Sequence, residues 1–413
     1  MIAALTRVFG VHNLALAEDV VQDAFCRALE VWRVRGLPPN PSAWLMTTAK
    51  NRALDVIRRE RTALTLAPEV GRLAASGRPA GPDAIEEAFA APAIRDEQLR
   101  MMFSCCHPRL PEDAQVALVL NILCGFGAGE VAAAFLTGRA AVEKRISRGK
   151  KVLGGARALF DLADAEFTSR LSAVRRALYL LFSEGYHGST AESAVRVELC
   201  AEAIRLVSLL LEHPPAAVPE TYALAALMCL HAARLPARLD EDGDLSPLLD
   251  QDRSRWDTAL VARGLDFFDR SASGETVTVY HLEAGIAAAH AAAPAVGDTD
   301  WALIVSLYDR LMASAPSPVV AMNRAIAIGQ RDGPERGLEA LHTIEDGDRL
   351  ARYPFYRAAL GDLELRRGRL DAARTHLQAA LVLARNDDER RLLERRLRLC
   401  SSGSAGARPS TPH

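Results

Sequence analysis

The sequence predicts an all-α protein: two small helical domains joined by a flexible linker, followed by a large helical extension. Three observations support this fold class. Ala, Leu and Arg are abundant while aromatic residues make up only 6% of the chain, a composition that favours helices over sheets. Apolar residues recur at helical spacing in most segments. Pro and Gly, with few large apolar residues, concentrate in residues 63–93, which predicts a linker there.

The breaks in helical spacing give the expected boundaries. We expect helical domains at residues 1–62 and 94–160, the linker at 63–93, the extension at 165–400 and a disordered tail at 401–413. At 413 residues, 49% of them hydrophobic, the chain exceeds one ordinary domain and can bury a large core.

The net charge of −2 conceals an asymmetry between the two ends of the chain. Residues 1–160 contain 21 Lys+Arg against 16 Asp+Glu, and the remainder contains 29 against 36. A basic front and an acidic back suggest that only the front meets a polyanion.

Targeting and cysteine usage indicate a soluble cytoplasmic protein. The first residues lack a charged leader followed by an apolar core, and no apolar run approaches the ~20 residues that span a bilayer. The seven cysteines are odd in number and include no C-x-x-C pair, which fits a reducing cytosol without disulfides or a zinc ribbon. We therefore expect no membrane association.

The first helical block contains a helix from about Leu16 to Trp32. One apolar stripe is expected to face the core; it consists of Val21, Phe25, Ala28, Leu29 and Trp32. Asp19, Gln22 and Asp23 lie on the opposite side, where simple solvation is the favoured interpretation in isolation.

The next helix has a clear start, since Asn40 can cap it and Pro41 occupies its first position. Leu45, Ala49, Ala53 and Val56 form its buried stripe, whereas Trp44, Asn51 and Arg58 share the other face, with Arg59 and Arg61 nearby. A tryptophan among polar residues is costly to leave solvated unless something stacks on it. This face resembles a platform for unstacked bases with cations for phosphates; packing of Trp44 against a neighbouring helix is equally compatible.

The second helical block reads as a helix-turn-helix. Its parts are a helix at Ala114–Leu123, a short helix from Gly129 or Glu130 to Phe135, a turn at Leu136–Gly138, and a third helix at Arg139–Lys151 with six basic residues and one acid. Val142, Ile146 and Leu153 form the apolar side of the third helix. The basic side chains lie opposite or flank that side: Arg139, Lys144, Arg145, Arg148 and Lys151. Such a helix fits the DNA major groove and its phosphates, and DNA binding is favoured over a merely solvated helix.

Small residues in the extension recur at the spacing of closely packed helix pairs. Gly361, Gly368, Ala373 and Ala380 are seven, five and seven residues apart, as in a tetratricopeptide repeat. Residues 318–345 look like a degenerate second copy. Arrays of this kind usually offer a concave face to a peptide or protein; a helical bundle without a ligand is the less favoured alternative.

Enzyme chemistry is not expected, because no phosphate-binding glycine loop, nucleophile elbow or catalytic triad is visible. Cys105 and Cys106 are adjacent and point about 100° apart on a helix. One metal ion is therefore not expected to use both, and small buried hydrophobes are expected instead. His187 and the Gln251–Asp257 segment could line a small-ligand pocket, although a buried hydrogen-bonded network is the favoured interpretation. No metal or cofactor is predicted.

Several segments together resemble a known family. Ala17–Phe25 resembles the A-E-D-x-x-Q-[ED]-x-F signature of sigma domain two, Trp44–Arg59 resembles its promoter-melting helix, and Glu130–Lys151 looks like sigma domain four. Further segments are similar to the extracytoplasmic-function subgroup of sigma-70 factors with a tetratricopeptide-like extension: Leu178–Tyr186, Asp250–Asp257, Thr299–Trp301 and Pro316–Arg324. The resemblance covers nearly the whole chain, although family members usually have a longer first helix, so sigma domain two is expected to be short at its start.

The resemblance implies a sigma factor that brings core RNA polymerase to promoter DNA. By position, the −10 element would be contacted by Trp44, Asn51, Arg58 and Arg59, and the −35 element by Arg139, Lys144, Arg145 and Arg148. Asp19, Gln22 and Asp23 would face the clamp helices of polymerase, whose flap is a second expected contact. We hypothesise that the extension docks on the sigma domains and regulates them. The alternative is a tetratricopeptide-like interaction scaffold with a degenerate sigma region.

Overall fold

The fold is known from a computed structural model, whose described residues are 1–9, 14–66, 98, 100–134, 137–154, 164–186, 195–240, 244–344, 350 and 353–402. These residues form helices, turns and loops, and their only β-type pairing is a single antiparallel bridge between Leu239 and Leu245. The all-α prediction is therefore confirmed. Most of the expected linker at 63–93 lies outside the described residues. Its first four positions belong to α3, which continues to Leu66.

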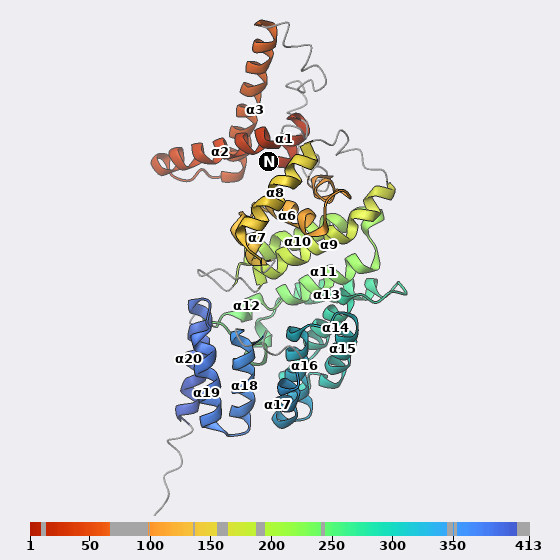
Figure 1. Cartoon of the computed structure of the whole chain (residues 1–413), viewed down its shortest axis with the longest axis vertical. Coiled ribbons are helices and arrows are strands. Elements are labelled where there is room, and N and C mark those ends of the chain that lie inside the picture. Colours follow the sequence, from red (N-terminus) through yellow and green to blue (C-terminus); the bar gives the residue numbers. More distant parts are fainter. Residues whose placement is uncertain are drawn as a thin grey trace, which may run out of the picture. The chain divides into compact units, whose positions relative to one another are not determined.

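The chain divides into two compact units, Met1–Leu178 and Tyr179–His413, with the boundary inside helix α9 (Asp164–Tyr186) (Figure 1). The other named helices of the first unit are α1 (Ile2–Phe9), α2 (Leu14–Arg35), α3 (Pro41–Leu66), α6 (Glu112–Ile122), α7 (Ala128–Ala134) and α8 (Arg139–Gly154). Residues 100–105 are also helical.

Helices α1, α2 and α3 share one core, and their ends follow the local sequence. Gly36 adopts a left-handed φ of 76° after α2, and its N–H donates to the carbonyl of Trp32 at 2.9 Å, which is the usual glycine stop. The side-chain oxygen of Asn40 accepts the N–H of Ala43 at 3.0 Å at the start of α3. The predicted Asn40–Pro41 helix start is therefore confirmed.

The buried side of α2 differs from the predicted stripe. Phe25 and Leu29 are 47% and 73% exposed. The buried residues of α2 are instead Leu14, Ala17, Val20, Val21, Ala24 and Ala28. The prediction was wrong for Phe25 and Leu29 because α1 and α3 pack on the alanine-rich side of α2, where small side chains let helices approach closely.

In the second unit consecutive helices pack against one another (Figure 1). They are α10 (Val197–Leu211), α11 (Pro219–Ala232), α12 (Leu235–Arg238), α13 (Thr258–Ser271), α14 (Val279–Ala292), α15 (Trp301–Ser314), α16 (Pro318–Arg331), α17 (Pro334–His342), α18 (Pro354–Arg366), α19 (Leu370–Val382) and α20 (Asp387–Ser402). Short 3₁₀ turns lie at Pro214–Ala216, Leu248–Asp250, Arg253–Arg255 and Val296–Asp298. Helix α11 is buried on nearly every side between α10, α13 and α14, which explains its continuous apolar sequence.

Glycines set the spacing of two helix pairs in the extension. A Cβ added at Gly361 of α18 would lie 2.7 Å from Cγ of Leu377 on α19. One added at Gly337 of α17 would lie 2.8 Å from Cα of Gly329 on α16. The predicted close helix pairs are present. Gly368, however, has a φ of 74° and ends α18, so its role is a turn and not helix packing.

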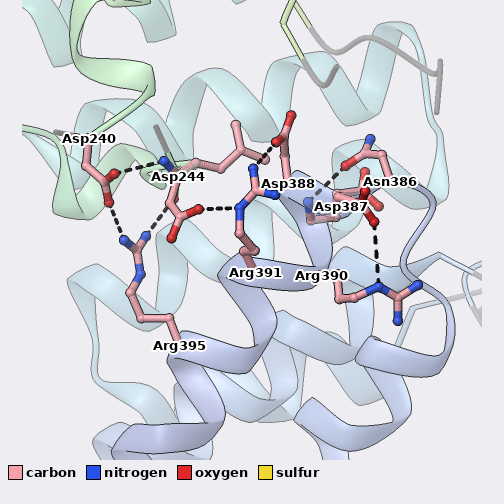
Figure 2. Close-up of polar contacts among 10 residues, drawn as sticks. Asp240, Asp244, Asn386, Asp387, Asp388, Arg390, Arg391 and Arg395 are labelled. Atoms are coloured by element: carbon pink, nitrogen blue, oxygen red, sulfur yellow. Dashed lines mark hydrogen bonds and ion pairs between the residues drawn. The ribbon is translucent and has the colours of Figure 1, made fainter. Parts of the chain in front are cut away.

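Arginines of α20 pair with acidic residues that precede them by about 150 positions in the same unit (Figure 2). Arg391 Nε contacts the carboxylate of Asp244 at 2.5 Å. Arg395 pairs with Asp240 and donates a hydrogen bond to the carbonyl of Leu245 at 2.6 Å. These contacts fasten the last helix of the array to the segment that follows α12.

Candidate nucleic-acid interface

Helices α6, α7 and α8 form the helix-turn-helix, and the third helix begins at Arg139 as predicted. The carbonyl of Gly138 accepts the N–H of Ala141 at 3.0 Å at this start. Val142 and Leu153 are almost fully buried and Ile146 is 8% exposed, so they form the apolar back of α8. The predicted amphipathic character of the helix is confirmed.

Helix α8 crosses α6 at a glycine. Gly149 is buried, and a Cβ placed there would lie 2.6 Å from Cδ1 of Leu118, itself fully buried in α6. Since carbon atoms pack at about 3.5–4.0 Å, only glycine allows this crossing. The close approach places the basic side of α8 away from α6.

Of the four basic residues predicted to contact DNA, two form ion pairs with nearby carboxylates and two form none with described residues. Arg139 is exposed and pairs with Glu143 at 2.8 Å, and the Nη2 of Arg145 lies 4.0 Å from Asp113. Lys144 and Arg148 are exposed and form no ion pair with any described residue. Exposed ion pairs are weak in water, so phosphate oxygens can displace the carboxylates from both arginines.

The polar face of α3 remains accessible, with one aromatic contact. The rings of Trp44 and Trp32 meet edge to face, with centroids 5.5 Å apart, and Trp44 is partly exposed. The packing interpretation of Trp44 is thus supported, yet part of the ring still faces solvent. Asn51 and Arg59 are exposed, and the side chain of Arg58 lies outside the described residues.

The residues predicted to meet polymerase line a shallow groove between α2 and α3. Asp19, Gln22 and Asp23 are all exposed, and Asp23 pairs with Arg52 of α3 at 2.8 Å. The groove encloses about 420 Å³, and its lining residues are Leu16, Asp19, Val20, Gln22, Asp23, Cys26, Arg52 and Val56. The structure therefore brings the three predicted residues onto one surface.

Sequence reasoning missed the exposed apolar residues of the same helix and of the loop that follows it. Phe25, Leu29, Val34 and Leu37 are between 47% and 83% exposed. Exposed apolar groups beside polar ones are typical of a protein interface. Helical periodicity could not separate them from core residues, because it reports spacing and not which side is covered.

Comparisons with known proteins match three parts of the chain. Sigma-70 region 2 matches residues 2–63, and sigma-70 region 4 matches residues 100–153. A family of unknown function (DUF6596) matches residues 170–272. An uncharacterized protein of Rhizobium meliloti (strain 1021) is 38% identical over 387 residues, which cover 94% of this chain and 90% of that relative.

The chain belongs to the sigma-70 family. It is an extracytoplasmic-function-like sigma factor with a C-terminal extension. Sigma factors of this family are DNA-binding transcription regulators, and regions 2 and 4 make core RNA polymerase and promoter DNA the partners of this protein. No solved structure matches the sigma factor.

The cysteines of the sigma factor behave as small buried hydrophobes where this was predicted. Cys105 and Cys106 are 0% and 1% exposed. Burial raises the pKa of the Cys106 thiol to about 12, so thiolate chemistry is disfavoured there. Within the described residues no group of three His, Cys, Asp or Glu side chains is placed to hold a metal ion. No helix in that same part of the chain is long and apolar enough to cross a membrane.

Proposed function

We propose that this sigma factor directs core polymerase to promoters with separate −10 and −35 elements and that its extension regulates this activity. The observation that carries the proposal is α8, a helix with a buried apolar back and an exposed basic front at the third position of a helix-turn-helix. A helix of this shape and charge fits a DNA major groove. The cytoplasm, where transcription takes place, is the predicted location.

At the −35 element Lys144 and Arg148 are proposed as primary contacts, because no described carboxylate competes for them. Arg139 and Arg145 are proposed to exchange Glu143 and Asp113 for phosphate or base oxygens. An arginine that reaches a guanine edge adds base specificity, whereas phosphate contacts add affinity and register.

At the −10 element the proposed contacts are Trp44, Asn51, Arg58 and Arg59. The exposure of Asn51 and Arg59 and the partly exposed ring of Trp44 support this role. An aromatic ring can stack on an unpaired base while nearby cations neutralise the strand. The proposal includes Arg58 on sequence spacing alone, since it is seven positions from Asn51 in a helical pattern.

Polymerase is proposed to bind α2 through Asp19, Gln22 and Asp23, with its clamp helices covering the exposed apolar residues Phe25 and Leu29. The flap of polymerase is the proposed contact of the second sigma domain. An acidic groove next to an apolar patch suits a partner that is basic and apolar at once.

The central experiment is run-off transcription with the full-length chain and core polymerase, on promoters recovered by sequencing transcripts after induced expression. Lys144→Ala and Arg148→Ala are expected to weaken promoter binding, each lowering the slope of log K against log salt by about 0.9 per lost phosphate contact. Arg205→Ala is the matched control, because this exposed arginine of α10 pairs with Glu202 in the extension. Complete absence of promoter-dependent transcripts from the unmutated chain would favour the scaffold alternative.

Regulation by the extension is tested by a chain that ends at residue 178. Cutting there, and not at residue 165, keeps the buried Arg170, which donates to the carbonyl of Phe103 at 3.0 Å within the first unit. The acidic surplus of residues 161–413 supports docking on basic DNA-binding surfaces. Transcription and signal response that are identical with and without the extension would discard this part of the proposal. We also propose that the helix pairs of the extension bind a peptide or protein ligand.

A further inference from the structure

Three arginines of the extension lie close together, one of them buried and two partly exposed, and none of them pairs with a described carboxylate. They are Arg234 after α11, Arg238 at the end of α12 and Arg253 in the turn before α13. Among the described residues no carboxylate lies within ion-pair distance of any of them. The arginines of α20 in the same unit, in contrast, pair with aspartates (Figure 2). Buried charges are normally paired, so this cluster requires an explanation.

Two aromatic rings hold the three guanidinium groups close together. The Cζ atoms of Arg234 and Arg253 lie 5.7 and 5.3 Å from the ring centre of Trp256. Those of Arg234 and Arg238 lie 5.9 and 4.3 Å from the ring centre of Tyr186. Cation–π contacts stabilise a guanidinium group at a ring face, but they leave its positive charge in place.

Hydrogen bonds to neighbouring residues position Arg253 and Arg234 but do not use all of their N–H donors. Arg253 donates to the carbonyls of His290 and Ala293 at 2.9 and 2.6 Å and to the hydroxyl of Thr299 at 2.9 Å. Arg234, only 8% exposed, donates through Nε to Gln251 at 3.2 Å. The predicted hydrogen-bonded network around Gln251 is thus present: Gln251 accepts from Arg234 and donates to the carbonyl of Ser246 at 2.9 Å.

Several buried nitrogen atoms in this network have no hydrogen-bond partner in the part of the chain that the structure describes. They are Nε of Arg238, Nε of Arg253, the indole N–H of Trp256 and Nδ1 of His290. The terminal nitrogens of Arg234 also donate to no described residue. Unsatisfied buried donors are costly, and a concentration of donors without acceptors is the hydrogen-bonding complement of an oxyanion.

The charges around the arginine cluster also favour an anion. Burial, followed by the charges of Arg234 and Arg253, lowers the pKa of His290 to about 3, so this ring is neutral near neutral pH. Burial and the charges of Arg238 and Arg253 also lower the pKa of Arg234. Glu283, a buried carboxyl of α14, accepts a hydrogen bond from Tyr179 and pairs with none of the three arginines. The charge of Asp298 acts to raise the pKa of Arg253, but the two form no ion pair.

We propose that Arg234, Arg238, Arg253 and the indole N–H of Trp256 form a binding site for a small molecule that carries a phosphate or carboxylate group. The planar guanidinium fork matches both oxyanions. A nucleic acid or protein surface does not fit, because Arg234 and Trp256 are over nine-tenths buried. Arg238 and Arg253 are partly exposed, which places the entrance on their side. The site extends the proposed function, since it makes the extension a receptor for a metabolite.

The test is binding to the full-length chain, measured by isothermal titration calorimetry and thermal unfolding with potassium phosphate, potassium succinate or potassium chloride at equal ionic strength. We expect saturable binding and a higher Tm with at least one oxyanion and not with chloride. Stronger binding of phosphate identifies a phosphorylated ligand, and stronger binding of succinate identifies a carboxylic acid. Absence of saturable binding of either oxyanion up to about 10 mM would overturn the proposal.

Variants assign the binding to the cluster. Arg234→Gln is expected to weaken it at least about ten-fold, because a charge-assisted contact is lost. Arg263→Gln is the matched control, since this arginine also lies over a ring, that of Phe267 at 5.2 Å, but on the exposed face of α13. Equal affinity in Arg234→Gln and the unmutated chain would place the oxyanion elsewhere, for example on α8, and refute the site.

If Arg234→Gln does not fold, Arg234→Lys keeps the charge and removes the fork. It is expected to weaken binding about several-fold, and unchanged affinity in it would also refute the site. None of these measurements involves transcription, so a failure here is distinguishable from a failure of the proposed sigma-factor function.

Discussion

Replacing Gly149 by alanine tests whether the close crossing of α8 and α6 requires a residue without a side chain. The new Cβ would lie 2.6 Å from Cδ1, 3.0 Å from Cγ and 3.1 Å from Cδ2 of Leu118. Leu118 is fully buried, within a run of buried residues from Val116 to Leu120, so it cannot swing away. Restoring a normal carbon contact therefore requires α8 to shift by at least roughly 0.9 Å.

Overpacking of this kind costs about 3 kcal/mol at the upper end of its usual range. The better helix propensity of alanine returns about 1 kcal/mol, so the net loss is about 2 kcal/mol. Hydrogen exchange of the α6 and α8 amides in the full-length chain measures it directly, and about thirty-fold faster exchange is expected, since each 1.4 kcal/mol is tenfold.

Gly154→Ala is the matched control on the same helix. A Cβ at Gly154 meets nothing within 4 Å, so this variant gains helix propensity without a clash and is expected to exchange as slowly as the unmutated chain or more slowly. Unchanged or slower exchange in Gly149→Ala would refute the argument that the crossing excludes a side chain.

Three further predictions concern the extension. Arg395→Ala removes the contact with Asp240, so urea unfolding should show a loss of stability that shrinks in about 1 M salt; a loss independent of salt would contradict an electrostatic role. Gly361→Ala, which clashes with Leu377, is expected to lose about 1–3 kcal/mol, and an unchanged urea midpoint would contradict the close helix pair. Burial raises the pKa of Glu283 from 4.5 to about 7. The unfolded chain therefore releases this proton first, and unfolding free energy relative to Glu283→Gln should fall by on the order of 3 kcal/mol as pH rises from about 4.5 to about 7; a difference that stays flat with pH would contradict it.

Local signals in the sequence were sufficient for much of the sigma region. Asn40 and Pro41 mark a helix start that depends only on neighbouring atoms, and the cap is present. The start of α8 at Arg139 and the apolar back containing Val142 follow from spacing along one helix. Such features are predictable because capping and periodicity involve residues a few positions apart.

Packing partners could not be predicted in the same way. Periodicity placed Phe25 and Leu29 in the core of α2, but α1 and α3 pack on its alanine side and leave both exposed. Gly361 and Gly368 are the same residue type, yet Gly361 packs against Leu377 of the neighbouring helix and Gly368 ends α18 with a positive φ. Which role a glycine has depends on the approach of another segment.

The helical class, the ends of individual helices and the basic front of α8 are predictable from the sequence, because each depends on residues close together along the chain. Which arginines find an aspartate depends instead on how distant segments fold together. Arg395 reaches Asp240 from about 150 positions away, whereas Arg234 contacts the amide of Gln251, two aromatic rings and other cations, and no carboxylate among the described residues pairs with it. Charge pairing is a property of distance in space, which the order of residues does not contain.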